Sequence, residues 1–194
     1  MKRIALTGGP GAGKTVVAGA LVRRHPHRFA LVPEAATQIY DRLQTRWDKL
    51  DVPGRRDVQR MIYALQIEQE SRVERMFPEK ILLLDRGTID GAAYWPDGPD
   101  AYWVDLNTTL GEELNRYQAV IFLETAASLG IYDGNESNAC RFEDREGAIR
   151  SGQILMQLWE KHSRIIHVPA SREIVEKVDA VERTIEELRR GAPR

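Results

Sequence analysis

Apolar residues gather in five short runs along the 194-residue chain. Each run is rich in Val, Ile, Leu, Phe or Ala, and a polar or turn-forming residue follows it. Short apolar runs bounded in this way are typical of strands buried on both faces of a sheet. The pattern therefore predicts five strands, over residues 2–7, 29–32, 81–85, 119–123 and 164–168.

Segments with apolar residues at helical spacing separate these runs and predict helices over residues 16–24, 34–47, 57–76, 106–114 and 154–159. Residues 48–56 contain Pro and Gly and predict a loop. A last helix is expected from residue 170, with Ser171 at its N-cap. Strands that alternate with helices favour right-handed crossovers, and hence an α/β fold with three layers and a five-stranded parallel sheet.

A glycine-rich motif lies directly after the first predicted strand and before the first predicted helix. It fits the pattern G-x-x-x-x-G-K-[ST] and consists of Gly8, Gly9, Pro10, Gly11, Ala12, Gly13, Lys14 and Thr15. Such a loop directs backbone N–H groups, and the N-terminus of the following helix, at phosphate oxygens. The lysine of such a loop contacts the β- and γ-phosphates, and the hydroxyl of the Ser or Thr that follows it can bind Mg²⁺. We therefore predict a P-loop NTPase fold that binds a nucleoside triphosphate.

Charged residues follow two of the other strands, where ligands bind in open α/β sheets. Asp85 ends the third strand and is a candidate Mg²⁺ ligand with Thr15, and Arg86 suits a phosphate or carboxylate. Glu34 follows the second strand and could meet a substrate hydroxyl. Alternatively, Glu34 is an acidic residue in the first turn of the next helix, where the helix dipole favours a negative charge. The alternative for Arg86 is a structural ion pair with Asp85 or Asp90.

Two further segments have a structural and a functional interpretation. Gln66, Gln69 and Arg72 form a helical stripe that could contact a base or ribose, although such residues are usually solvated. Residues 94–103 include four aromatic side chains, which could stack on a flat ligand or cover the core.

A lid is predicted at residues 134–152, where Arg141 and Arg145 are four residues apart and would share one helix face. Arginines that close over a nucleotide stabilise charge on the transferred phosphoryl group. The same stretch contains Glu143, Asp144 and Glu146, so a solvated, salt-bridged helix is the alternative.

Composition narrows the classes of function. Hydrophobic residues make up 42% of the chain, charged residues 29%, and the formal net charge is −1. This balance gives no overall basic field for nucleic acid. The single cysteine, Cys140, cannot form an internal disulfide, and no apolar run has the length of a membrane span. We expect one cytosolic domain over residues 1–194.

Taken together, the motifs resemble the small P-loop kinases, closest to the AAA-labelled, NadR-like (nicotinamide-riboside-kinase-like) group of ATP-binding domains. The resemblance covers the whole chain and rests on residues 7–15, 32–36, 85–90 and the arginines near 141–145. It implies ATP, Mg²⁺ and a lid over the phosphates, but it names no acceptor. Asp85-Arg86-Gly87 also resembles the acidic-Arg step of deoxynucleoside kinases, which sits near the acceptor hydroxyl; those enzymes carry an acid after the second strand, matching Glu34.

Three functions are compatible with these residues. The first is a kinase that transfers the ATP γ-phosphate to a small acceptor, such as a nucleoside: Lys14 with Arg141 or Arg145 would stabilise charge, and Glu34 or Asp85 would act as the general base. Arg86 would hold the acceptor. The second is a nucleotide-binding regulatory module without an acceptor. The third is a GTPase switch, which ranks last because no Asn-Lys-x-Asp motif follows the fourth strand. The sequence does not select the nucleobase of the bound nucleotide or the oligomeric state.

Overall fold

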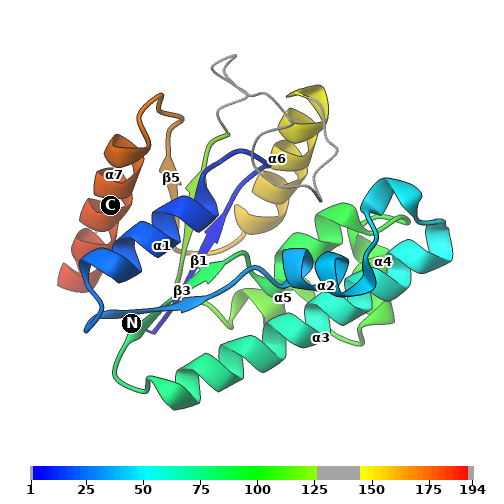
Figure 1. Ribbon diagram of the computed structural model, residues 1–194, viewed down its shortest axis with the longest axis horizontal. Helices are drawn as coiled ribbons and strands as arrows, with labels where there is room; N and C mark the ends of the chain where they lie inside the picture. The colour runs from blue at the N-terminus through cyan, green and yellow to red at the C-terminus, as the bar shows by residue number, and fades with distance from the viewer. Residues whose placement is uncertain (1, 126–144, 192–194) are drawn as a thin grey trace.

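The computed structural model describes residues 2–125 and 145–191 (Figure 1). All five predicted strands are present, each within one residue of its expected ends. They are β1 (Arg3–Thr7), β2 (Phe29–Val32), β3 (Ile81–Asp85), β4 (Ala119–Leu123) and β5 (Ile165–Val168). These strands form one parallel sheet in the order β2-β3-β1-β4-β5. The predicted parallel sheet is therefore confirmed.

The sheet order places the end of the glycine-loop strand beside the end of the aspartate strand. Leu6 in β1 lies opposite Asp85 in β3 and opposite Ile121 in β4. Because all the strands are parallel, their carboxyl ends meet at one edge of the sheet. Residues that follow β1, β2 and β3 therefore converge there from distant parts of the sequence.

Helices cover both faces of the sheet and give the predicted three layers (Figure 1). On one face, α1 (Lys14–Arg24) and α7 (Ile174–Arg190) share a core cluster with Ile81 and Leu83 of β3. On the other face, Leu82 and Leu84 pack with residues of α3 (Val52–Met76) and α6 (Arg145–Trp159). This alternation follows from the two-residue period of a strand. Three short elements complete the second face: η2 (Thr88–Tyr94), α4 (Pro99–Asp105) and α5 (Leu110–Leu114).

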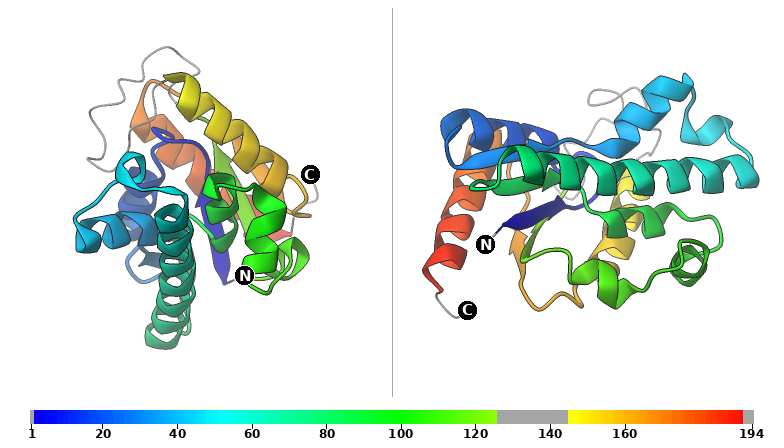
Figure 2. Two further views of the ribbon diagram at one scale, coloured as in Figure 1. Left: turned by 90° about the vertical axis from the view of Figure 1, so that its right-hand side faces the viewer. Right: turned by 90° about the horizontal axis from the view of Figure 1, so that it is seen from below.

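The predicted helix 34–47 is shorter than expected. The helix α2 covers Ala35–Leu43 and ends at Gln44, which has the left-handed φ of 50°. A short 3-10 turn, η1 (Trp47–Lys49), follows. Figure 2 shows the N-terminal end of the long α3 between α2 and the segment that contains α4. Side chains from α2, η1, α3 and α4 line one pocket.

The helix α3 begins at Val52, so the predicted loop over 48–56 and the predicted start at Asp57 are wrong. Pro53 lies in the first turn, where its missing N–H costs nothing, and the Asp51 carboxylate caps the helix by accepting the Gly54 N–H at 2.9 Å. Pro53 and Gly54, which favour a loop by residue type, therefore lie in the first turn of α3. The solvated interpretation of Gln66 and Gln69 is also wrong, since both side chains are buried, whereas Arg72 is exposed.

The last helix starts later than predicted, and Ser171 is not its N-cap. The helix α7 begins at Ile174 after Glu173, which makes no side-chain capping bond. The Ser171 hydroxyl instead accepts the Glu173 N–H at 3.1 Å and donates to Glu176 Oε2 at 2.5 Å. Within residues 2–125 and 145–191, no helix has the length and apolar character needed to span a membrane.

Candidate active site

The glycine loop connects β1 to α1 and packs tightly against the end of β4. Gly8 has a φ of 132°, and a Cβ added there would lie 2.1 Å from the Leu123 carbonyl oxygen. Gly13, which precedes α1, has a φ of 83°. Only glycine tolerates these two positions without a clash or backbone strain, which explains the motif physically.

Side chains from distant elements fix the outer side of this loop. The Thr125 hydroxyl donates to the Pro10 carbonyl at 2.5 Å. The buried Lys177 ammonium on α7 donates to the carbonyls of Ala12 at 3.1 Å and Glu124 at 2.9 Å. Burial lowers the pKa of Lys177. These bonds tie the loop to β4 and α7.

Lys14 is the first residue of α1, and its side chain is buried against the loop. Its ammonium donates to the carbonyls of Gly8 at 2.7 Å and Gly9 at 3.0 Å. The Lys14 ammonium therefore lies against the glycine loop, next to the N-terminus of α1, where the binding of an anion is favoured.

Thr15 and Asp85 form a contact pair beside the loop. The Thr15 hydroxyl donates to Asp85 Oδ2 at 2.5 Å. Asp85 Oδ1 is buried and accepts no hydrogen bond from residues 2–125 or 145–191. Burial, and then the negative charge of Glu34, raise the pKa of Asp85 despite the opposing Lys14. An orphaned, buried carboxylate oxygen beside a hydroxyl matches the hard oxygen ligands that Mg²⁺ prefers.

Glu34, Arg86 and Asp90 form a second charged group. The Arg86 guanidinium donates to Glu34 Oε1 at 2.5 Å through Nε and to Asp90 Oδ2 at 3.3 Å through Nη1. The other Glu34 oxygen accepts the Thr37 hydroxyl at 2.6 Å. Burial alone would lower the pKa of Arg86, but Tyr94, Glu34 and Asp90 raise it well above its usual range. Arg86 is therefore a permanent cation between two carboxylates.

The backbone of Arg86 has a φ of 78°, which is rare for a residue with a side chain. Its N–H donates to the Leu6 carbonyl at 3.1 Å, and its carbonyl accepts the Gln66 amide at 3.3 Å. Strained residues of this kind gather at functional sites, where the surroundings impose the conformation. From this backbone conformation the Arg86 guanidinium contacts Glu34, which follows a different strand.

Asp90 is buried beneath this group and is satisfied by three donors. Its Oδ1 accepts the Thr7 hydroxyl at 2.9 Å and the Trp159 indole N–H at 2.7 Å, and Arg86 is the third donor. Burial raises the pKa of Asp90, and Arg86 and Trp159 oppose that shift. The predicted structural ion pair of Arg86 with Asp90 is therefore present together with the Glu34 contact.

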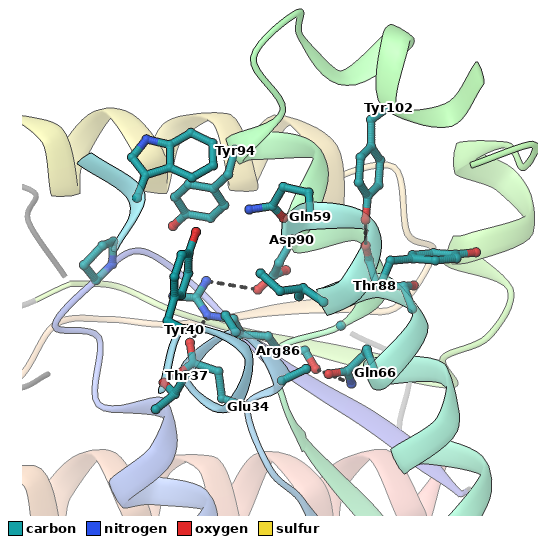
Figure 3. Close-up of a pocket in the computed structure, with 18 of the residues that line it drawn as sticks. Glu34, Thr37, Tyr40, Gln59, Gln66, Arg86, Thr88, Asp90, Tyr94 and Tyr102 are labelled. Carbon is teal, nitrogen blue, oxygen red and sulfur yellow. Dashed lines mark hydrogen bonds and ion pairs between the residues drawn. The ribbon is translucent and has the colours of Figure 1, made fainter. Parts of the chain in front are cut away.

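A pocket of about 230 Å³ adjoins these charges (Figure 3). Glu34, Arg86 and Asp90 line it together with Pro10 of the glycine loop. Residues 94–103 divide between the two interpretations, because Tyr94 lines the pocket, the buried Trp95 and Trp103 belong to the core, and Tyr102 does both. The remaining walls come from α2, η1 and α3, and include Tyr40, Trp47, Gln59, Ile62, Tyr63 and Gln66.

A buried polar network holds the segment that follows Arg86. The Tyr117 hydroxyl accepts the Thr88 N–H at 2.8 Å, and the Tyr102 hydroxyl donates to the Thr88 carbonyl at 3.0 Å. The Thr88 hydroxyl donates to Glu113 at 2.6 Å. Such a network limits movement of the segment that follows Arg86, since every displaced group would lose a buried hydrogen-bond partner.

The structure brings most of the candidate residues of the sequence together. Lys14, Thr15 and Asp85 meet at the loop, and Glu34 meets Arg86 at the pocket. Arg141 and most of the predicted lid lie outside the described residues. Arg145 is the first residue of α6, and only its backbone is described.

Three residues of this site were missed or undervalued from the sequence. Gln59 lies two helical turns before Gln66 and so shares its face, a spacing that could have identified it. The sequence indicates Asp90 only as a structural partner of Arg86. Lys177 had no sequence signal, because its contact with the loop depends on how α7 packs.

Comparisons with known proteins agree with this architecture. A family model described as an AAA domain matches residues 3–177, so the chain belongs to this AAA domain family. A solved structure of deoxyadenosine kinase from M. mycoides with bound dATP superposes with a TM-score of 0.62 at 12% identity. The match covers 96% of this chain and 100% of that one. It shows a shared P-loop, kinase-like fold. A search of curated proteins gave no match.

Proposed function

We propose that this protein is a kinase that uses ATP and Mg²⁺ to phosphorylate a hydroxyl group of a small acceptor. The observation that carries the proposal is that Pro10 of the glycine loop and Glu34 line one pocket. The phosphate-binding loop and the acceptor pocket therefore share a wall, as transfer between two bound molecules requires.

On the nucleotide side, the loop N–H groups, Lys14 and the N-terminus of α1 would bind the phosphates of ATP. Lys14 would exchange its contacts with the Gly8 and Gly9 carbonyls for phosphate oxygens. Thr15 and Asp85 would hold Mg²⁺, which neutralises charge on the phosphates when bound.

On the acceptor side, we propose Glu34 as the general base. Glu34 lines the pocket, whereas Asp85 does not and bonds Thr15 instead. The Glu34 carboxylate would accept the proton of the acceptor hydroxyl as that oxygen bonds to the γ-phosphorus, and the bond from this phosphorus to the β–γ bridging oxygen breaks to release ADP. Arg86 orients Glu34 through the 2.5 Å contact.

Arg141 and Arg145 would contribute positive charge over the transferring group as part of a lid at 134–152. Support comes from Gly152 on α6, where an added Cβ would lie 3.8 Å from the Gly9 Cα. The middle of α6 therefore lies next to the glycine loop. We further propose a single domain over residues 1–194 and a cytosolic location, the latter because the single cysteine suits a reducing compartment.

The proposal is tested by ATP turnover with Mg²⁺ against a panel of nucleosides, nucleotides, sugars and other hydroxyl metabolites, with an acceptor-free background. A kinase gives turnover that one class of acceptor stimulates, with a phosphorylated product detected by mass spectrometry. Tight ATP binding without stimulation by any acceptor would contradict the kinase proposal and favour a regulatory nucleotide-binding module. The same turnover measured with GTP in place of ATP gives the nucleobase preference of the phosphate donor.

A further inference from the structure

Lys177 is a buried lysine on the face of α7 that packs into the core. Its side chain is 3% exposed, and Val178, Val181 and Ile185 of the same helix belong to a core cluster. Burial disfavours the ammonium and lowers its pKa, and the Glu124 charge opposes that shift. A position that only filled space would hold an apolar side chain at a lower cost, so this ammonium indicates a role beyond packing.

The ammonium of Lys177 joins the glycine loop to the end of β4. It donates to the Ala12 carbonyl at 3.1 Å and to the Glu124 carbonyl at 2.9 Å. Its aliphatic stem lies near Gly13, because a Cβ added to that glycine would be 3.9 Å from Lys177 Cδ. Figure 1 shows α7 beside α1, the helix that begins where the loop ends. Lys177 therefore supports the loop from the side of α7.

The bond to Ala12 fixes the orientation of one peptide group in the loop. The peptide between Ala12 and Gly13 is trans, and the carbonyl and N–H of a planar trans peptide point to opposite sides. A carbonyl held on the α7 side therefore directs the Gly13 N–H to the other side of the loop. Gly13 is left-handed, with φ 83° and ψ 14°, which is the conformation found in anion-binding nests. Lys177 thus orients an N–H of the kind that binds phosphate.

A second side chain fixes the loop in the same way. The Thr125 hydroxyl donates to the Pro10 carbonyl at 2.5 Å, and this carbonyl shares a peptide with the Gly11 N–H. Two of the loop peptides are therefore oriented by hydrogen bonds to their carbonyls. Thr125 lies just after β4, whereas Lys177 is 165 residues beyond Ala12 in the chain and reaches it only because α7 packs against the loop.

We propose that Lys177 is a positioning residue for nucleotide binding, which holds the Ala12 carbonyl on the α7 side so that the Gly13 N–H is ready to bind a phosphate. Lys177 acts through the loop backbone and does not contact the nucleotide. The inference rests on the proposed function in one respect, because it takes the glycine loop as the phosphate site. It does not depend on the acceptor or on transfer.

Equilibrium binding of ADP and of a non-hydrolysable ATP analogue, each with Mg²⁺, tests this role by isothermal titration calorimetry. Lys177→Met keeps the length of the side chain and removes its donors. Both nucleotides should bind about 10- to 100-fold more weakly, because a misoriented N–H loses a hydrogen bond to a charged group. The stoichiometry gives the folded fraction, so the dissociation constant describes folded protein. Wild-type dissociation constants in Lys177→Met would overturn the inference.

Two further variants separate positioning from packing. Ile185→Val removes one methylene from a buried residue two turns further along α7, and should lower the melting temperature without changing nucleotide affinity. Lys177→Arg keeps the charge and the donors, and should recover most of the affinity lost in Lys177→Met. Equal weakening in Ile185→Val and Lys177→Met would overturn the inference, because the effect would then come from the packing of α7.

The amide signal of Gly13 in ¹H–¹⁵N spectra reports the orientation of its N–H directly. In wild type and Lys177→Arg this signal should shift when ADP is added, and the shift should be lost in Lys177→Met. Lys177→Gln, whose shorter side chain does not span both carbonyls, carries this test if the methionine variant does not fold. Gly111, an exposed glycine on α5, is the reference signal. The same Gly13 response in wild type and in the methionine or glutamine variant would overturn the inference.

Turnover separates failure of the two proposals. Nucleotide binding that depends on Lys177, without turnover stimulated by any acceptor, would leave the inference standing and refute the kinase. Turnover stimulated by an acceptor, with nucleotide affinity unchanged in Lys177→Met, would support the kinase and refute the inference.

Discussion

Asp85 accepts a 2.5 Å hydrogen bond from Thr15, although 70 residues separate them in the chain. The contact exists because β1 and β3 are neighbours in the sheet, so the helix after the glycine loop begins beside the end of β3. The second Asp85 oxygen is buried and has no hydrogen-bond partner in the part of the chain that the structure describes. This pair is the part of the site that best fits a divalent cation.

The variant Asp85→Asn should lose activity while it keeps the shape of the site. An amide is a weaker ligand for Mg²⁺ than a carboxylate, so we expect kcat to fall about 10²- to 10³-fold and the Mg²⁺ concentration for half-maximal activity to rise. Steady-state kinetics over a Mg²⁺ titration measures both. Asp100→Asn, at an exposed position, should behave as wild type. Wild-type Mg²⁺ dependence in Asp85→Asn would remove Asp85 from the metal site.

The same variant should stabilise the nucleotide-free protein near neutral pH. The pKa of Asp85 is raised in the folded state, so the folded protein binds this proton more tightly than the unfolded chain, whose aspartates titrate near about 3.9. The Asp85 contribution to the free energy of unfolding therefore falls as pH rises from about 4 through the raised pKa, then levels off.

Thermal unfolding of wild type and Asp85→Asn across this pH range measures the effect. The two proteins should have similar stability near pH 4, and the advantage of the variant should open as pH rises. Taking the difference between them cancels the exposed acids whose pKa values are lowered, such as Asp48 and Asp105. A variant that is less stable than wild type at pH 7 would contradict the raised pKa.

Lys14→Ala should weaken ATP binding by about 100-fold or more, because it removes a buried cation from the phosphate loop. Isothermal titration calorimetry with a non-hydrolysable ATP analogue gives the dissociation constant. Lys161→Ala is the control, since Lys161 is exposed and far from the loop in sequence. If ATP bound equally well without Lys14, the phosphate-site interpretation would be wrong.

Glu34→Gln should lower kcat about 10²- to 10⁴-fold, the usual contribution of a general base, with little change in ATP affinity. The amide keeps the shape beside Arg86 but cannot take the proton. Glu68→Gln, at an exposed position of α3, is the matched control. Single-turnover measurements isolate the chemical step. A kcat within a factor of a few of wild type would exclude Glu34 as the base.

Asp51→Ala should destabilise the protein by about 1 kcal/mol, because the Gly54 N–H at the start of α3 loses its cap. For a chain of this size the melting temperature should fall by roughly 2–4 °C. Differential scanning calorimetry of Asp51→Ala and of Glu79→Ala, an exposed position outside any helix or strand, provides the comparison. Equal melting temperatures for the two variants would show that the cap contributes nothing.

The helix starts mark where prediction from the sequence failed. By residue type Pro53 and Gly54 predict a loop, but a proline in the first turn and an Asp51 cap begin a helix just as well. Ser171 fits a cap equally well by residue type, yet the helix starts three residues later. Capping residues also favour turns, so residue type alone does not separate the two outcomes.

The glutamines show a second limit. Gln66 and Gln69 look like solvated positions of a long helix, whereas both are buried, one against Arg86 and the other against Gln38. Whether a polar helical residue is solvated depends on what packs over its face, and that packing involves residues far away in the chain.

The strands, the glycine loop and the charged strand ends could be predicted from the sequence, because their signals are local: apolar runs, a glycine-rich motif, and acids or arginines directly after the strands. Which of these strand ends meet depends on the packing of the whole fold. Sheet order paired Thr15 with Asp85 and Glu34 with Arg86, and the packing of α2 and α3 left Gln59 buried beside aromatic walls. Such contacts are set by the packing of whole elements, which no local pattern encodes.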